Sequence, residues 1–412
     1  MKVTQVSQIL NTVIREVLGQ QALGEDGQPI SDWVVSEDLS NVVSVGKSFD
    51  NMLAQNNAYD KYIGKLINHI GRVIFVDRVY EGQAPSVLLD GWEYGSILEK
   101  IDCGLPESQW NMSWELTDGT TYDQDVFKAP KDVQVQFFND MVTFEVDMSF
   151  TNLQIRQSFS SAQQLNGFFS MIESRIQMRR TMDYDNLIMR TINHFTAATL
   201  ETSFDDTSVL TGKTGPRAVN LLHLYKTNVS GADKTLTPEN CLKNTEFLKF
   251  ASYQLMLWSD RLVKASTMFN IGKRVRFTPK NLQHIVLLSE FERAADVYLQ
   301  SSTFHNELTK LPKAESVTFW QGSGEDFSFA NTSEIHVVIR DPNSPNGNGT
   351  VEVAVSGILG VMFDRDALGV NNKENRITSH YNAKAEFTNN FYKSDARFFN
   401  DYKENFIVFF VA

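Results

Sequence analysis

The chain has 412 residues, 42% hydrophobic and 21% charged, an ordinary balance for a folded protein of two or three domains. A net charge of −12, with no lysine or arginine run longer than two, argues against a dedicated nucleic-acid-binding protein. No stretch approaches the ~18 apolar residues of a membrane span, and the first residues lack an apolar signal core, so no membrane partner is expected.

The first element predicted is a short amphipathic helix over residues 3–18. Its apolar residues recur at helical spacing, and Gly19 ends it. The polar residues 24–29 that follow have turn composition. Such a helix cannot bury its apolar face alone, so we expect it to dock on the body of the protein or on a neighbouring chain.

The next region contains an irregular excursion. Helical spacing returns over 49–70, and a strand is predicted over 72–80. Residues 81–130 show little regular pattern and hold three of the six tryptophans, Trp92, Trp110 and Trp114. So long an irregular region is unusual inside a compact domain, which indicates an excursion that packs on something else.

Strict alternation over 142–150 predicts the clearest strand of the chain. The longest helix candidate follows over 161–198, with Ser161 and Gln164 resembling a capping box. Such a helix would be on the order of 55 Å long and would need an elongated body to lie on.

The remaining elements are shorter. Thr237 and Pro238 predict the start of a helix that runs to about Met268. Alternating segments then predict the following strands, helices and loop: strands over 275–277, 284–288, 317–320, 334–340, 351–355 and 358–363, a helix over 289–300, and an exposed loop over 341–349. The closing segment is predicted as a strand over 381–392, a short helical piece over 397–402 and a strand over 406–412.

Sequence motifs for catalysis or metal binding are missing. No two histidines stand at i, i+4, and neither cysteine, Cys103 or Cys241, belongs to a zinc-site spacing, so both are predicted to be thiols of a reducing compartment. No nucleophile elbow or dinucleotide-binding glycine motif occurs. We therefore predict no enzyme activity, no catalytic residue, no cofactor and no metal.

An arginine group on the long helix has two interpretations. Arg175, Arg179, Arg180 and Arg190 could contact DNA phosphates, but carboxylates such as Asp183 lie within helical reach, so ion pairing is favoured. Any contact with DNA is therefore expected to be weak and non-specific. We expect His194, near the end of the same helix, to be a core or dipole-compensating residue rather than a ligand.

Four segments carry a resemblance to a known family: Leu287–His305 (LLSEFERAADVYLQSSTFH), Gly357–Gly369 (GILGVMFDRDALG), Tyr381–Arg397 (YNAKAEFTNNFYKSDAR) and Glu404–Phe410 (ENFIVFF). Together with the order of elements, they resemble the major capsid protein of tailed bacteriophages of the Hong Kong 97 type. The resemblance implies an α+β fold with an N-terminal arm, an extended E-loop, a long spine helix, and peripheral and axial domains.

The resemblance also divides the chain. It implies these segments: an arm over 1–48, the entry helix and strand of the peripheral domain over 49–80, an E-loop-like excursion over 81–140, the peripheral domain with its spine helix over 141–280, the axial domain over 281–348, and a return with the closing strand over 349–412. The arm and the excursion would bury apolar side chains on neighbouring subunits. The expected interface residues are Trp33, Trp92, Trp110, Trp114, Arg72 and Arg78.

The implied function is self-assembly. Subunits would form the pentamers and hexamers of an icosahedral virion shell that encloses double-stranded DNA, assembled in the bacterial host cytoplasm. A portal is an expected partner. A separate scaffolding protein is another, because no segment typical of a processed scaffolding domain precedes the fold.

Three alternatives stay open. An encapsulin-type nanocompartment shell shares the fold and would co-purify with cargo protein instead of DNA. A soluble α/β enzyme with dispersed catalytic residues would be a monomer with a deep pocket. A portal subunit would form a ring, and portals are usually richer in helix than the strands over 142–150 and 334–363 indicate.

Overall fold

Both helices and strands build the chain, which confirms the predicted α+β class. The computed structural model describes residues 3–18, 33–48, 65, 84–88, 98–106, 108, 115, 117–120, 133–151, 162–204, 207, 210–300, 311–318, 320, 334–340 and 349–412. These residues belong to two compact units, each assembled from separate parts of the chain. Unit 1 is Met1–Gly82, Met141–Asp185 and Asn372–Arg397; unit 2 is Gln83–Asp140, Asn186–Asn371 and Phe398–Ala412.

Unit 1 begins with the predicted amphipathic helix, α1 (Val3–Leu18). Its apolar stripe is buried inside the unit, together with apolar side chains of 33–48. Asn11 fixes that following segment, because its side-chain amide donates to the Val35 carbonyl at 2.9 Å and its side-chain oxygen accepts from the Val35 amide at 2.7 Å. The apolar face of the arm thus docks on its own chain, which corrects the expectation that it is buried on a neighbour.

A three-stranded sheet completes unit 1, with the order β10-β11-β3. The strand β3 (Met141–Thr151) is the one that strict alternation predicted, and it pairs antiparallel with β11 (Phe387–Asn400). The third strand, β10 (Leu368–Asn382), lies on the other side of β11. Phe150 and Tyr392 project from this sheet into the core that holds α1.

The predicted long helix is α5 (Ala162–Phe204), which passes from unit 1 into unit 2 after Asp185. Its predicted capping residue Ser161 lies outside the described residues. In unit 1 only one side of the helix is buried, whereas in unit 2 nearly every residue is buried, including polar ones such as Asn193 and Thr196. Because polar residues are also buried here, the apolar spacing no longer marks the helix. The helix therefore continues past residue 198, where the apolar spacing predicted its end.

The core of unit 2 is a five-stranded sheet with the order β4-β12-β9-β5-β6. The strand β12 (Phe406–Phe410) pairs parallel with β4 (Ala218–Asn220) and antiparallel with β9 (Ile358–Asp364). On its other side, β9 pairs antiparallel with β5 (Gln283–Leu288), which pairs parallel with β6 (Glu315–Val317). All residues of β9 and β12 are buried. Their continuous apolar runs are typical of strands covered on both faces.

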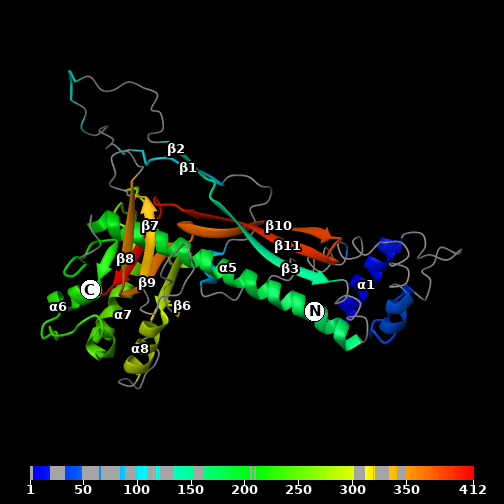
Figure 1. Ribbon diagram of the computed structural model, residues 1–412. Coiled ribbons are helices and arrows are strands. Elements are labelled where there is room, and N and C mark those ends of the chain that lie inside the picture. The colour runs from blue at the N-terminus through cyan, green and yellow to red at the C-terminus, as the bar shows by residue number, and fades with distance from the viewer. Residues whose placement is uncertain are drawn as a thin grey trace. The chain divides into compact units, whose positions relative to one another are not determined.

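Three helices pack beside this sheet: α6 (Leu221–Asn228), α7 (Thr245–Leu262) and α8 (Ser289–Gln300) (Figure 1). Helix α7 contacts both α6 and α8, and α8 contacts β5. The range of α8 confirms the predicted helix over 289–300. Burial of the apolar sides of these helices covers the sheet and completes the core of unit 2.

Two predicted elements and the bounds of a third are wrong. The helix expected from Thr237 to about Met268 exists as α7 but begins only at Thr245, where Asn244 caps it by accepting a hydrogen bond from the Phe247 amide at 3.0 Å. The helical piece predicted over 397–402 is mostly strand, because β11 continues to Asn400. The strand predicted over 275–277 is only a single bridge at Arg276.

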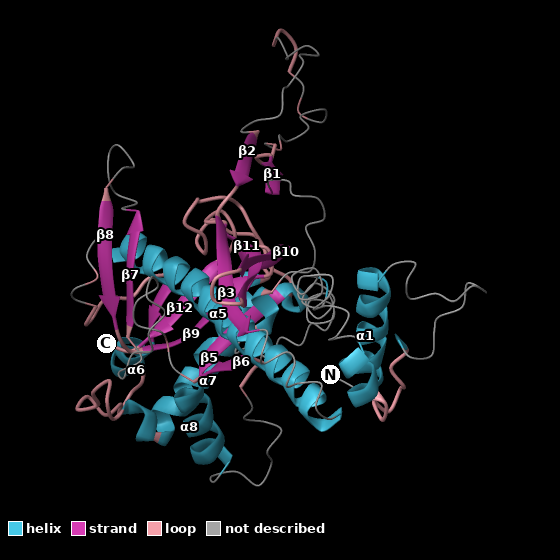
Figure 2. Cartoon of the chain, turned by 45° about the vertical axis from the view of Figure 1, so that its right-hand side comes forward, coloured by secondary structure: helices cyan, strands magenta, loops and turns pink. Residues whose placement is uncertain are grey.

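A further pair of strands confirms the sequence prediction. The strands β7 (Ile335–Arg340) and β8 (Thr350–Val355) form an antiparallel two-stranded sheet and lie side by side in Figure 2. Residues 341–348 of the predicted loop lie outside the described residues. Within the described ranges, no helix is both long and apolar enough to cross a bilayer.

Candidate assembly interface

The excursion over 81–140 contains a hairpin in unit 2. The strands β1 (Leu98–Asp102) and β2 (Gln134–Phe138) pair antiparallel, with Leu98 opposite Phe138 and Asp102 opposite Gln134. Side chains alternate between the two faces of such a pair. The result is an inner face that packs on unit 2 and an outer face that points to solvent, and the two faces differ in chemistry.

The outer face of the β1–β2 hairpin is apolar and exposed. Ile101 lies opposite Val135, and Glu99 lies opposite Phe137. The exposed fractions are 70% for Ile101, 47% for Val135 and 61% for Phe137, and Leu105 beside them is also exposed. Scattered apolar residues are normal on a surface, but a contiguous group on one strand face marks an interaction site.

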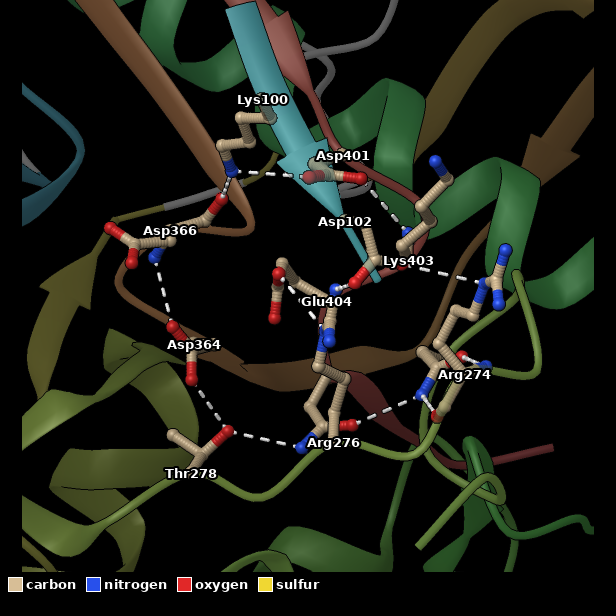
Figure 3. Close-up of polar contacts among 12 residues, drawn as sticks. Lys100, Asp102, Arg274, Arg276, Thr278, Asp364, Asp366, Asp401, Lys403 and Glu404 are labelled. Carbon is tan, nitrogen blue, oxygen red and sulfur yellow. Dashed lines mark hydrogen bonds and ion pairs between the residues drawn. The ribbon is translucent and has the colours of Figure 1, made fainter. Parts of the chain in front are cut away.

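The inner face holds a charged cluster at the root of the hairpin (Figure 3). The Lys100 ammonium lies 3.1 Å from the Asp401 carboxylate and donates to the Asp366 carbonyl at 2.6 Å. The Asp102 carboxylate lies 2.9 Å from the Arg276 guanidinium. On its other side, Arg276 lies 3.2 Å from Glu404. We call the five ion-paired residues the root cluster: Lys100, Asp102, Arg276, Asp401 and Glu404. The root cluster ties β1 to two distant segments of unit 2.

Aromatic contacts reinforce the root cluster. The Phe138 and Phe399 rings pack with their centroids 5.2 Å apart. The Lys100 ammonium lies 5.0 Å from the Phe399 centroid, within the range of a cation–π contact. The inner face of the hairpin therefore has both apolar and ionic partners on its own unit, whereas the outer face is exposed among the residues that the structure describes.

Burial and neighbouring charges shift the pKa of two residues in the root cluster, Glu404 and Arg276. Burial raises the pKa of Glu404 above its ordinary value, although the Arg276 cation opposes this. For Arg276, burial lowers the pKa, but the carboxylates of Asp102, Glu404 and Asp401 outweigh it and raise the pKa overall. Arg276 thus stays charged, and Glu404 takes up a proton on acidification at a higher pH than an ordinary glutamate.

A polar cavity of about 300 Å³ lies against the root cluster, and its charged lining residues are Lys100, Asp102, Arg276, Asp366, Asp401, Lys403 and Glu404. Both cations and carboxylates line it, which suits internal pairing better than capture of one charged ligand. Within the described part of the chain, no group of three or more histidine, cysteine, aspartate or glutamate side chains is arranged to hold a metal ion.

The predicted interface residues are placed as follows. Trp33 is half-buried against the core of unit 1. Arg72, Arg78, Trp92, Trp110 and Trp114 lie outside the described residues. The sequence analysis missed the outer face of the hairpin, although the alternating sequence from Val133 to Phe137 carried a period-two signal for β2.

The arginine group of the long helix makes internal contacts. Arg179 lies 3.1 Å from Asp183, which confirms the predicted pairing, and Arg190 lies over the Phe398 ring at 5.8 Å. His194 is partly buried, and burial together with the Arg190 charge lowers its pKa to about 4. Its position within the buried half of α5 fits the core interpretation. Burial raises the pKa of the Cys241 thiol to about 11, so this sulfur is protonated at neutral pH.

Comparison with solved structures gives remote likenesses to phage capsids. A chain of the Staphylococcus phage Andhra capsid is 11% identical, with 81% of this chain and 86% of that chain covered and a TM-score of 0.45. A chain of the cyanophage P-SCSP1u capsid is 12% identical, with 81% and 88% covered and a TM-score of 0.42. A chain in the structure of the head fiber and inner core protein gp22 of bacteriophage P68 is 9% identical, with 82% and 86% covered and a TM-score of 0.48.

The family comparison covers almost the whole chain. No curated protein matches the sequence. The family model described as Phi29-like phage major capsid protein matches residues 20–410, a range that includes most of both units, the hairpin and the root cluster. The chain belongs to the Phi29-like phage major capsid protein family, and it is a structural protein of the phage capsid shell.

Proposed function

We propose that copies of this chain form the pentamers and hexamers of an icosahedral phage head around double-stranded DNA, and that each copy buries the outer face of its β1–β2 hairpin on a neighbouring copy. The observation that carries this proposal is the exposed apolar group of Ile101, Val135 and Phe137. Each large apolar side chain that becomes fully buried contributes about 1.5–3 kcal/mol. Repeated at every contact in a shell, this face supplies a substantial association energy.

The root cluster gives the hairpin a defined orientation. Lys100 and Asp102 hold β1 by ion pairs to Asp401 and Arg276. A preorganised apolar face loses less conformational entropy on docking than a flexible one. The root cluster therefore favours docking on a neighbour without taking part in the contact itself.

The segment assignments follow from the same proposal. The range 81–140 serves as the E-loop, α5 as the spine helix, 141–280 as the peripheral domain and 281–348 as the axial domain. The range 1–48 is the arm, although its apolar stripe is buried in unit 1. The tryptophans Trp33, Trp92, Trp110 and Trp114 and the arginines Arg72 and Arg78 stay proposed contacts between subunits.

The partners are those of a phage head. A portal and a separate scaffolding protein would join the shell during assembly in the host cytoplasm. The net charge of −12 supports only weak, non-specific contact with packaged DNA, since like charges repel. The match to a phage capsid family supports a phage head over a nanocompartment shell or a portal ring.

The substitution Phe137→Asp tests the hairpin proposal. Because Phe137 is mostly exposed in the isolated chain, the variant should fold with the same unfolding temperature as the unmodified protein. It should fail to form shells in electron microscopy and light scattering, because a carboxylate would be buried unpaired against a neighbour. The matched control Phe137→Leu keeps an apolar side chain and should form shells. Normal shells from the Phe137→Asp variant would refute the proposed contact.

A further inference from the structure

A second exposed apolar surface lies on α7 and the segment after it. Two exposed apolar residues lie on α7, and four more follow the helix. We call the six together the α7 patch: Tyr253, Met256, Val263, Met268, Val275 and Phe277. Tyr253 is 58% exposed and Phe277 is 60% exposed. The opposite side of α7 is buried in unit 2, so the α7 patch is apolar surface that the core of the chain does not use.

Backbone hydrogen bonds bring the second half of the α7 patch beside the first. The Thr278 amide donates to the Leu262 carbonyl at 2.8 Å. Ser266 and Arg276 exchange two backbone hydrogen bonds, at 2.9 and 3.0 Å. These bonds fold residues 275–277 back beside the end of α7, which places Phe277 near Val263.

The α7 patch faces away from the root cluster of its own chain. Arg276 turns toward Asp102, whereas its neighbours Val275 and Phe277 are exposed. Side chains of consecutive residues in an extended segment point to opposite sides. The hairpin that Arg276 holds is therefore not placed to cover Phe277 in the same chain.

The charges around the α7 patch are mostly positive. Lys264, Lys273 and Lys280 are exposed along this segment. The one carboxylate in the sequence from 253 to 280 is Asp260, and it pairs with Lys280 at 2.6 Å. A positive surface stands out on a chain with a net charge of −12.

The β1–β2 hairpin has the opposite charge. Among the described residues between 98 and 140, the exposed charged side chains are all acidic: Glu99, Glu115, Asp118 and Asp140. Glu99 lies directly opposite Phe137 on the outer face. We infer that the hairpin of one copy docks with this outer face on the α7 patch of the next copy, an inference that rests on the proposed function and adds its receiving surface.

Charge and apolar surface both indicate that the α7 patch binds a second copy of the chain. Each chain carries an acidic, apolar hairpin and a basic, apolar patch, so each surface has the complement that the other lacks. A contact between two different surfaces of identical chains repeats from copy to copy and closes into a ring when the rotation permits. That is the geometry that a capsid capsomer requires.

Three full-length variants and one control test the inference. Phe277→Asp should fold with an unchanged unfolding temperature and form no shells, with the subunit association constant reduced at least about tenfold. Lys264→Glu should also weaken assembly, and Glu99→Lys added to it should restore shells by re-forming an opposite-charge pair. Val297→Asp, at an equally exposed apolar position on α8, is the control and should assemble.

The outcomes separate the two levels of the account. If Phe137→Asp blocks assembly and Phe277→Asp does not, the α7 patch is not the receiving surface and the hairpin proposal stands. If both assemble, both ideas fail. If Lys264→Glu weakens assembly and Glu99→Lys does not restore it, the two surfaces do not meet, and the inference is overturned. The inference is supported if neither Phe137→Asp nor Phe277→Asp forms shells and if Glu99→Lys restores shells in the Lys264→Glu variant.

Discussion

The five-stranded sheet of unit 2 and the β1–β2 hairpin are both rich in apolar residues, yet they bury them differently. In β9 and β12 every residue is covered within the chain. In the hairpin only the inner face is covered, and Phe137 lies in solvent. A continuous apolar run thus indicates a strand that is buried on both faces within a single chain. An alternating strand with apolar residues on its solvent side indicates a surface kept for another copy.

The largest effect on stability is expected at the sheet. Phe406 is fully buried and lies 4.1 Å from Phe195 between ring centroids. Phe406→Ala should reduce the free energy of unfolding by about 3–5 kcal/mol, because it removes the transfer energy of the ring and leaves a cavity. Phe137→Ala should change it by no more than about 0.5 kcal/mol. Chemical denaturation of the two variants measures the contrast, and equal losses would contradict it.

The second-largest effect on stability is expected from acid, which should destabilise the buried core around His194. The pKa of His194 falls from 6.5 to about 4 on folding, so the folded state resists protonation. The stability contribution is complete above pH 6.5 and is lost as the pH falls toward 4, by about 3 kcal/mol in total. A His194→Gln variant should lack this part of the pH dependence. Unfolding measured across this pH range would contradict the account if both proteins gave the same slope.

A smaller effect is expected at the root of the hairpin. Asp102→Asn removes the charge that pairs with Arg276, and we expect a loss of about 1–2 kcal/mol in the free energy of unfolding, since the site is only partly buried. Hydrogen exchange of the β1 amides should quicken more than that of the β12 amides. Asp118→Asn, at an exposed carboxylate of the same excursion, is the control. Unchanged exchange in β1 would show that the root cluster does not hold the hairpin.

Sequence periodicity predicted the elements that have one simple environment. The helix over 3–18, the strand over 142–150 and the apolar strand at Phe406 each follow from their local pattern. The family resemblance, carried by motifs such as Glu404–Phe410, is confirmed by the family match. Where the apolar spacing ended, tertiary contacts determined the length of the element. Helix α5 continues past residue 198 because its polar residues are buried in unit 2.

The candidate interface was harder to predict because its parts come from distant segments. Asp102, Arg276 and Glu404 converge only in the folded chain, and no spacing in the sequence connects them. Exposure of an apolar side chain is also a tertiary property. The alternation at Val133–Phe137 is typical of a strand, but it does not indicate which of its faces the protein covers.

Hydroxyl-radical footprinting of the purified chain before and after shell assembly tests the central claim most directly. The account predicts that Phe137 and Ile101 are oxidised readily in the free subunit and become strongly protected in the shell, while Val297 keeps its labelling. Equal oxidation of Phe137 in subunit and shell would mean that the outer face of the hairpin stays in solvent, and the proposed assembly contact would be wrong.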